Sequence, residues 1–151
     1  MKIKHMAAAF VTAVFLFTGC SGIGSTTRSY TYSVETGDSV KITLDTSDDY
    51  EITSDLPFVI SKDGETLSQG TFITASAYQE YVGTIENQEG VQLLDSGTKD
   101  GIEYIFWSYQ DAEYDYAILI EESETGIILG NNVSEDSAKE CFERLHFEIK
   151  K

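Results

Sequence analysis

The chain has 151 residues, with 26 Asp and Glu against 10 Lys and Arg, and its formal net charge is −16. This balance argues against nucleic acid as a partner, because a phosphate backbone is bound through Lys and Arg, and the basic residues here are scattered. The length suits one domain of ordinary size, and we expect the acidity to keep that domain dispersed in water.

The first twenty residues follow the pattern of an export signal. Two lysines precede an apolar stretch over 6–17, and a small residue, Gly19, comes directly before Cys20. A membrane-spanning helix would need about 20 apolar residues. The shorter stretch therefore predicts a secretory signal peptide over residues 1–19.

The residues that end this leader, Leu16-Phe17-Thr18-Gly19-Cys20, resemble the lipobox of bacterial lipoproteins. The resemblance implies that cleavage exposes Cys20 and that its sulfur carries a diacylglyceryl group. Two acyl chains hold a protein on a bilayer, so residues 20–29 are predicted to be a lipidated cysteine and a flexible linker. We expect attachment to the outer face of the cell membrane, or to the periplasmic side where the envelope has two membranes.

The remainder, residues 30–151, is predicted to be a single globular α+β domain. Apolar and polar residues alternate in its first half, which predicts strands at 40–44, 50–53, 58–62 and 65–73. Asp63-Gly64 fits the tight turn of a hairpin between the last two. Gly70 is predicted to mark a β-bulge in the second arm of this hairpin.

A change of period predicts a helix over 74–87, where Ser76 and Gln79 have the spacing of a capping box. Its apolar positions share one face, at Tyr78, Tyr81, Val82 and Ile85. Short loops then join four strands into an antiparallel meander, at 91–96, 102–109, 114–121 and 125–129. The second of these strands is apolar on both faces, which predicts a central position in a sheet covered on both sides.

The last elements are a helix after Ser134, which is a natural N-cap, and a closing strand that contains Phe147 and Ile149. This order of elements looks like the PsbP-like fold over about residues 50–150, in which an antiparallel sheet lies between helices as an α/β/α sandwich. The resemblance implies an accessory or binding role at a membrane. It rests on no catalytic motif, so no functional residue is carried over.

The sequence contains no recognisable catalytic constellation. His146 is the one histidine after the predicted leader, and no G-x-S-x-G motif accompanies it. Cys141 falls on the apolar stripe of the last predicted helix, where a cysteine packs as a small hydrophobe. One His and one Cys cannot supply a usual zinc site. We therefore predict no cofactor, no metal and no enzymatic activity.

Acidic turns and tyrosines remain as candidate binding features. Carboxylates gather at two turns of the meander, with Asp111, Glu113 and Asp115 at the first and Glu121, Glu122 and Glu124 at the second. They could bind calcium through oxygen ligands. Solvent-exposed turns without a bound ion explain them better. Tyr109 and Tyr114 bracket the first turn. We predict that they are exposed there and form the candidate interaction surface.

Together these features predict a membrane-anchored, extracytoplasmic, non-enzymatic binding or accessory module, whose partner is an envelope protein or a small molecule. The alternative from another class is a small carboxylate-dependent hydrolase of cell-surface glycans or peptides. That alternative requires one cleft in which two acids have opposed pKa shifts. The sequence does not indicate an oligomeric state.

Overall fold

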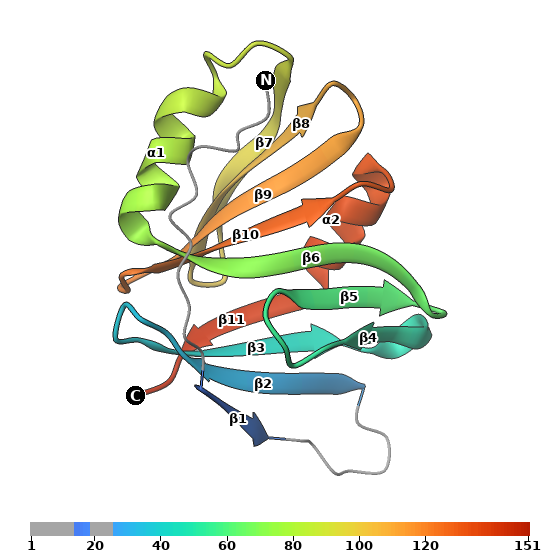
Figure 1. Ribbon diagram of the computed structural model, residues 1–151, viewed down its shortest axis with the longest axis vertical. Helices are drawn as coiled ribbons and strands as arrows, with labels where there is room; N and C mark the ends of the chain where they lie inside the picture. The colour runs from blue at the N-terminus through green and yellow to red at the C-terminus, as the bar shows by residue number, and fades with distance from the viewer. Residues whose placement is uncertain (1–13, 19–25) are drawn as a thin grey trace.

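The computed structural model describes residues 14–18 and 26–151, and it is mostly antiparallel β-sheet with two α-helices (Figure 1). Cys20 and the predicted cleavage site lie outside the described residues. In chain order the elements are β1 (Val14–Thr18), β2 (Thr27–Ser33), β3 (Ser39–Asp45), the 3-10 turn η1 (Ser47–Asp49), β4 (Tyr50–Ile52), β5 (Phe58–Lys62), β6 (Glu65–Thr74), α1 (Ala75–Ile85), β7 (Val91–Lys99), β8 (Ile102–Tyr109), β9 (Glu113–Ile120), β10 (Thr125–Asn131), α2 (Glu135–Glu143) and β11 (Leu145–Ile149).

The strands form two antiparallel sheets. The larger has seven strands in the order β4-β5-β6-β10-β9-β8-β7, and the smaller has four in the order β1-β2-β3-β11. In Figure 1, β1 and β2 of the smaller sheet lie lowest, while β3 and β11 lie at the height of β4 and β5 of the larger sheet. Because β2 starts at Thr27, ordered structure begins before residue 30, where the domain was predicted to start. β1 falls inside residues 1–19, the segment predicted to be the leader, and it pairs with β2.

The alternating pattern and the turn chemistry explain the hairpins of the first half. Val40, Ile42 and Leu44 of β3 are fully buried, which confirms the predicted strand with one covered face. Asp63 and Gly64 both have positive φ, at 51° and 81°, as a two-residue hairpin turn requires. The predicted hairpin of β5 and β6 is therefore confirmed.

The bulge predicted at Gly70 is wrong. The register shift between β5 and β6 lies at Ile60 and Ser61 instead. Gly70 is paired directly with Phe58, and the phenyl ring occupies the space that a Cβ atom on Gly70 would need. The glycine thus marks a close approach of a buried ring and not a change of register.

The two helices start at side-chain caps. The Thr74 hydroxyl accepts a hydrogen bond from the Ala77 N–H at 3.1 Å, so Thr74 caps α1, and the capping box predicted at Ser76 is wrong by two positions. The Ser134 hydroxyl accepts from the Ser137 N–H at 3.0 Å, which confirms the predicted start of α2. No helix in the described part of the chain is long and apolar enough to span a membrane.

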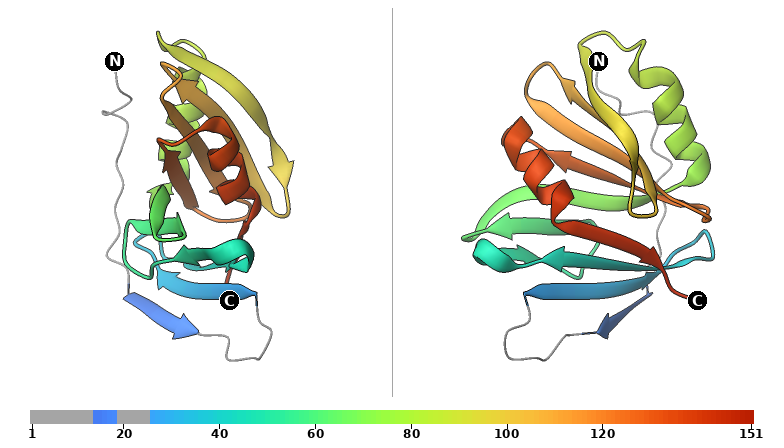
Figure 2. Two further views of the ribbon diagram at one scale, coloured as in Figure 1. Left: turned by 90° about the vertical axis from the view of Figure 1, so that its right-hand side faces the viewer. Right: turned by 180° about the vertical axis from the view of Figure 1, so that it is seen from behind.

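Strands β7 to β10 form the predicted meander, and α1 and α2 cover opposite sides of the seven-stranded sheet (Figure 2). β8 is buried on both faces as predicted, with Trp107 on the α1 side and Phe106 on the other. It lies next to the edge strand β7 and not at the centre of the sheet. A helix on each side therefore explains its apolar character better than a central position does.

Two apolar clusters hold these layers together. The cluster under α1 is small and includes Tyr81, whose ring stacks on Trp107 at 5.8 Å between centroids. The cluster on the other side is larger and joins α2, β11 and the smaller sheet to the seven-stranded sheet. Both sheets therefore share one continuous core.

Candidate ligand pocket between α1 and β7

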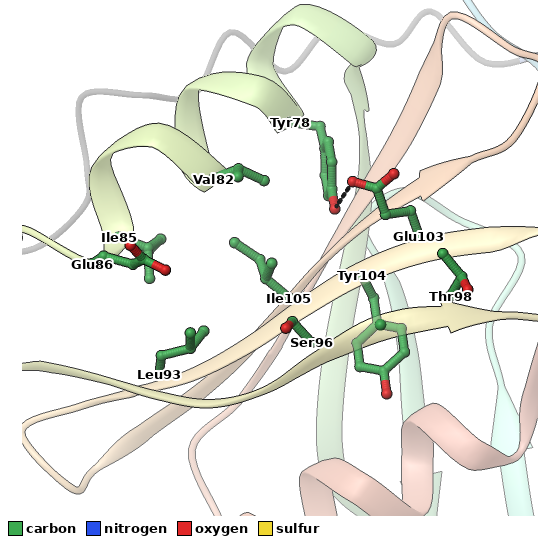
Figure 3. Close-up of a pocket in the computed structure, with 11 residues that line it drawn as sticks. Tyr78, Val82, Ile85, Glu86, Leu93, Ser96, Thr98, Glu103, Tyr104 and Ile105 are labelled. Atoms are coloured by element: carbon green, nitrogen blue, oxygen red, sulfur yellow. Dashed lines mark hydrogen bonds between the residues drawn. The ribbon is translucent and has the colours of Figure 1, made fainter.

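A pocket of about 330 Å³ opens between α1 and the edge of the seven-stranded sheet (Figure 3). Pockets that take small molecules have volumes from about 300 Å³ upward. The helix, β7 and β8 supply its lining, which consists of Tyr78, Val82, Ile85, Glu86, Leu93, Ser96, Gly97, Thr98, Glu103, Tyr104 and Ile105. Figure 3 shows that the Tyr104 side chain points away from α1, while the other labelled side chains lie around the space under the helix.

The pocket exists because β7 presents small side chains to the helix. A bulge shifts the register between Leu93 and Asp95. Beyond it, Ser96 pairs with Ile105 and Thr98 pairs with Glu103, so both small side chains face α1. Neither is large enough to fill the space below the helix, which remains open.

The middle of the pocket is apolar. Ile85 and Ile105 are buried, with 1% and 8% of their surfaces exposed, and they form its inner wall. Val82 and Leu93 also line the pocket and are exposed to 36% and 40%. Together with the two isoleucines they give the pocket an apolar middle, as is common in small-molecule sites.

One end of the pocket holds a positioned carboxylate. The buried Tyr78 hydroxyl donates a hydrogen bond to Oε1 of Glu103 at 3.1 Å. Burial raises the pKa of Tyr78, and the contact with Glu103 raises that pKa further, so the phenol keeps its proton and remains a donor. No hydrogen bond from the described residues reaches Oε2 of Glu103, which leaves this oxygen available to a ligand.

The other end of the pocket carries a second acid. Glu86 is the C-cap residue of α1, and Figure 3 places it away from Glu103, beside Ile85. Within residues 14–18 and 26–151, no Lys, Arg or His lines the pocket. Lys99, the cation at the end of β7, has its ammonium over the Phe142 ring, 5.1 Å from the centroid, on the α2 side of the sheet. The charge in this pocket is therefore negative.

The predicted interaction surface of Tyr109 and Tyr114 does not form. Tyr109 is buried, with only 7% of its surface exposed. Its partner in the β8 and β9 pairing is Glu113, so Tyr114, the next residue, points to the opposite face of the sheet. The Tyr114 hydroxyl donates to the carbonyl of Asp111 at 3.1 Å. The two tyrosines thus belong to different faces, and the prediction of one shared surface is wrong.

Cys141 and His146 do not belong to the pocket under α1. Cys141 is fully buried on α2, which confirms its predicted place in the core, and burial raises the pKa of its thiol. His146 is exposed on β11, opposite Thr43 in the strand pairing. Neither residue lines the pocket under α1.

The acidic turns do not converge on a metal site. Among the described residues, no three His, Cys, Asp or Glu side chains are grouped so that they could hold an ion. Asp111 is exposed in its turn, whereas Asp115 is built into β9 and pairs with Trp107. Burial, together with the nearby charge of Glu113, raises the pKa of Asp115 to about 7.

The half-buried Asp115 makes the stability of the fold depend on pH. Its pKa rises from an ordinary 3.8 to about 7 in the folded chain, so between these values the folded state holds a proton that the unfolded state has lost. Stability then falls as the pH rises through this range. We expect Asp115→Asn to become progressively more stable than the wild type from pH 4 to pH 7, by at most about 4 kcal/mol.

Urea unfolding of both proteins at a series of pH values measures this difference. Asp111→Asn, which replaces an exposed carboxylate in the turn before β9, is the control and should track the wild type. A difference between Asp115→Asn and the wild type that stays constant with pH would contradict the role of Asp115.

Comparison with known proteins adds no relative. No protein-family model matches the chain, and no curated protein or solved structure is significantly similar to it. The geometry of the pocket and the features of the leader are therefore the grounds for a functional proposal.

Proposed function

We propose that this protein is an exported, lipid-anchored binding module that holds a small molecule in the pocket between α1 and β7. The observation that carries the proposal is the pocket itself, with its exposed apolar residues Val82 and Leu93 and a positioned carboxylate at Glu103. Concave, largely apolar sites with a few placed polar groups are typical of small-molecule binding. The leader and Cys20 support the export and the anchor.

The proposal includes a relationship to PsbP-like proteins at the level of architecture. An antiparallel sheet with one helix on each side supports it. No ligand or residue role follows from that likeness.

Binding without catalysis suits the residues of the pocket. In the part of the chain that the structure describes, no His, Cys, Lys or Arg lines it. The alternative, a hydrolase, would need two carboxylates within about 10 Å of each other around the scissile bond. Glu86, the C-cap residue of α1, and Glu103 on β8 lie at different ends of the pocket (Figure 3). This separation favours two independent contacts with one ligand.

A pair of substitutions on β7 tests the pocket. Ser96 and Gln92 are both exposed, but Ser96 faces α1 and Gln92 pairs with Ser108 on the other face. A phenyl ring at position 96 should fill the pocket. We therefore expect Ser96→Phe to abolish ligand binding, and Gln92→Phe to leave it intact.

The measurement is a fragment screen by two-dimensional NMR on the full chain carrying Cys20→Ser, which removes the lipidation site. Hits should shift the amide signals of Leu93, Ser96 and Ile105 in the parent protein and in Gln92→Phe, and these shifts should vanish in Ser96→Phe. Hits that cluster elsewhere, or that survive Ser96→Phe, would contradict the proposed site.

A further inference from the structure

We infer that the ligand of this pocket is a linear aliphatic amine with a cationic group at each end, in the class of diamines and polyamines. The inference rests on the proposed function and specifies its ligand. Glu103 would pair with one ammonium group and Glu86 with the other, while the methylene chain between them would lie on the apolar wall formed by Ile85, Ile105 and Leu93.

The electrostatics select a cation. Among the described residues, the charged members of the lining are Glu86 and Glu103, and none of these lining residues is basic. The chain as a whole is strongly acidic, with a formal net charge of −16. Such a field concentrates cations at a negative cleft and repels anions. An ammonium group is also a donor of three hydrogen bonds, which suits the open Oε2 of Glu103.

The middle of the pocket selects a flexible apolar chain. Between the two carboxylates, Val82, Ile85, Leu93 and Ile105 contribute only hydrocarbon surface. A ligand with charge along its whole length would leave its charges unpaired over these residues. A methylene chain buries apolar surface there instead.

The placement of the acids selects charge at both ends of the ligand. Glu103 and Glu86 lie at different ends of the pocket, with the apolar side chains between them (Figure 3). A short monoamine can satisfy only one carboxylate at a time. A ligand with two cations joined by an aliphatic spacer reaches both, so the second contact forms without a second loss of translational freedom.

A matched series of eight-carbon probes tests the inference: 1,8-diaminooctane, octylamine, octanol and octanoate. Affinities are measured at pH 7 by calorimetry and NMR titration on the full chain with Cys20→Ser. The diamine should bind most tightly, the monoamine less tightly and the alcohol most weakly, and octanoate should not bind. Glu103→Gln and Glu86→Gln should each weaken the diamine by about fivefold, the upper range for exposed ion pairs. Added salt should reduce the difference between the probes.

Glu80→Gln is the matched control. Glu80 is an exposed glutamate of α1 that does not line the pocket, so its replacement should leave the affinity for the diamine unchanged. Because Glu86 and Glu103 are exposed as well, their glutamine variants should retain the wild-type midpoint of urea unfolding. A lost affinity is then a loss of contact and not of fold.

The outcomes separate this inference from the proposed function. The amine would be overturned if octanol and 1,8-diaminooctane bound with equal affinity and if Glu86→Gln and Glu103→Gln left the NMR shifts of the pocket unchanged. The pocket would then remain as an apolar site. The amine would also be overturned if no eight-carbon probe bound while the fragment screen still gave hits that Ser96→Phe removes. Failure of the fragment screen as well would overturn both.

Discussion

A Gly126→Ala variant is expected to lose about 3 kcal/mol of folding free energy or more. Gly126 lies in β10, between β9 and β6 in the middle of the seven-stranded sheet. An added Cβ would lie 2.5 Å from the backbone oxygen of Ile118 and 3.1 Å from Cγ1 of Ile73. Overpacking a core usually costs about 1–3 kcal/mol. Here the upper end applies, because a strand carbonyl cannot rotate away and the two strands must separate.

Urea unfolding, followed by circular dichroism and by the fluorescence of Trp107, the single tryptophan, measures this loss. Gly83→Ala is the matched control. Gly83 is exposed within α1 and has no atom within 4 Å of an added Cβ. Alanine there should raise stability by about 0.5–1 kcal/mol, the ordinary gain in a helix interior. A Gly126→Ala protein as stable as the wild type would refute the tight approach of β9 and β10.

Replacement of Cys20 by serine is expected to release the protein from the membrane. The proposal attaches the chain through a diacylglyceryl thioether, and a serine hydroxyl cannot form one. The net charge of −16 gives the chain no attraction to an anionic bilayer. Without the lipid, we expect nearly all of the protein to move from the membrane fraction to the soluble extracytoplasmic fraction or the medium.

Fractionation and metabolic labelling with a fatty acid analogue measure this change. The wild type should carry the label and Cys20→Ser should not, while Cys141→Ser, which alters the other cysteine, should stay labelled and membrane-bound. An unlabelled wild type whose first residue is still Met1 would contradict the anchor and the predicted cleavage together.

Local patterns predicted most of the secondary structure of this chain. Alternation predicted β3, the Asp63-Gly64 turn predicted the hairpin of β5 and β6, and the Ser134 cap predicted α2. Each of these signals is a property of a few adjacent residues. The error at Gly70 arose because a partner elsewhere in the sequence decides the outcome, since the role of this glycine depends on the ring of Phe58.

The pocket was not predicted, although the sequence contained one signal for it. Glu103 alternates with Ile105 and Trp107 on the same face of β8, so a carboxylate interrupts an otherwise apolar face. The small side chains of Ser96 and Thr98 lie opposite this face only because of the bulge after Leu93. Neither the bulge nor the position of α1 above it can be inferred from spacing along the chain.

The pairing of β1 with β2 would link the proposed export to the edge of the smaller sheet. If processing removes residues 1–19, it also removes Val14–Thr18, and β2 becomes the outermost strand. Its newly bared amides and carbonyls would then face solvent a few residues from the lipid. Arg28 is exposed on this strand. A charged side chain on an edge strand disfavours pairing with the strand of another molecule, so Arg28 would oppose association between neighbouring molecules on the bilayer.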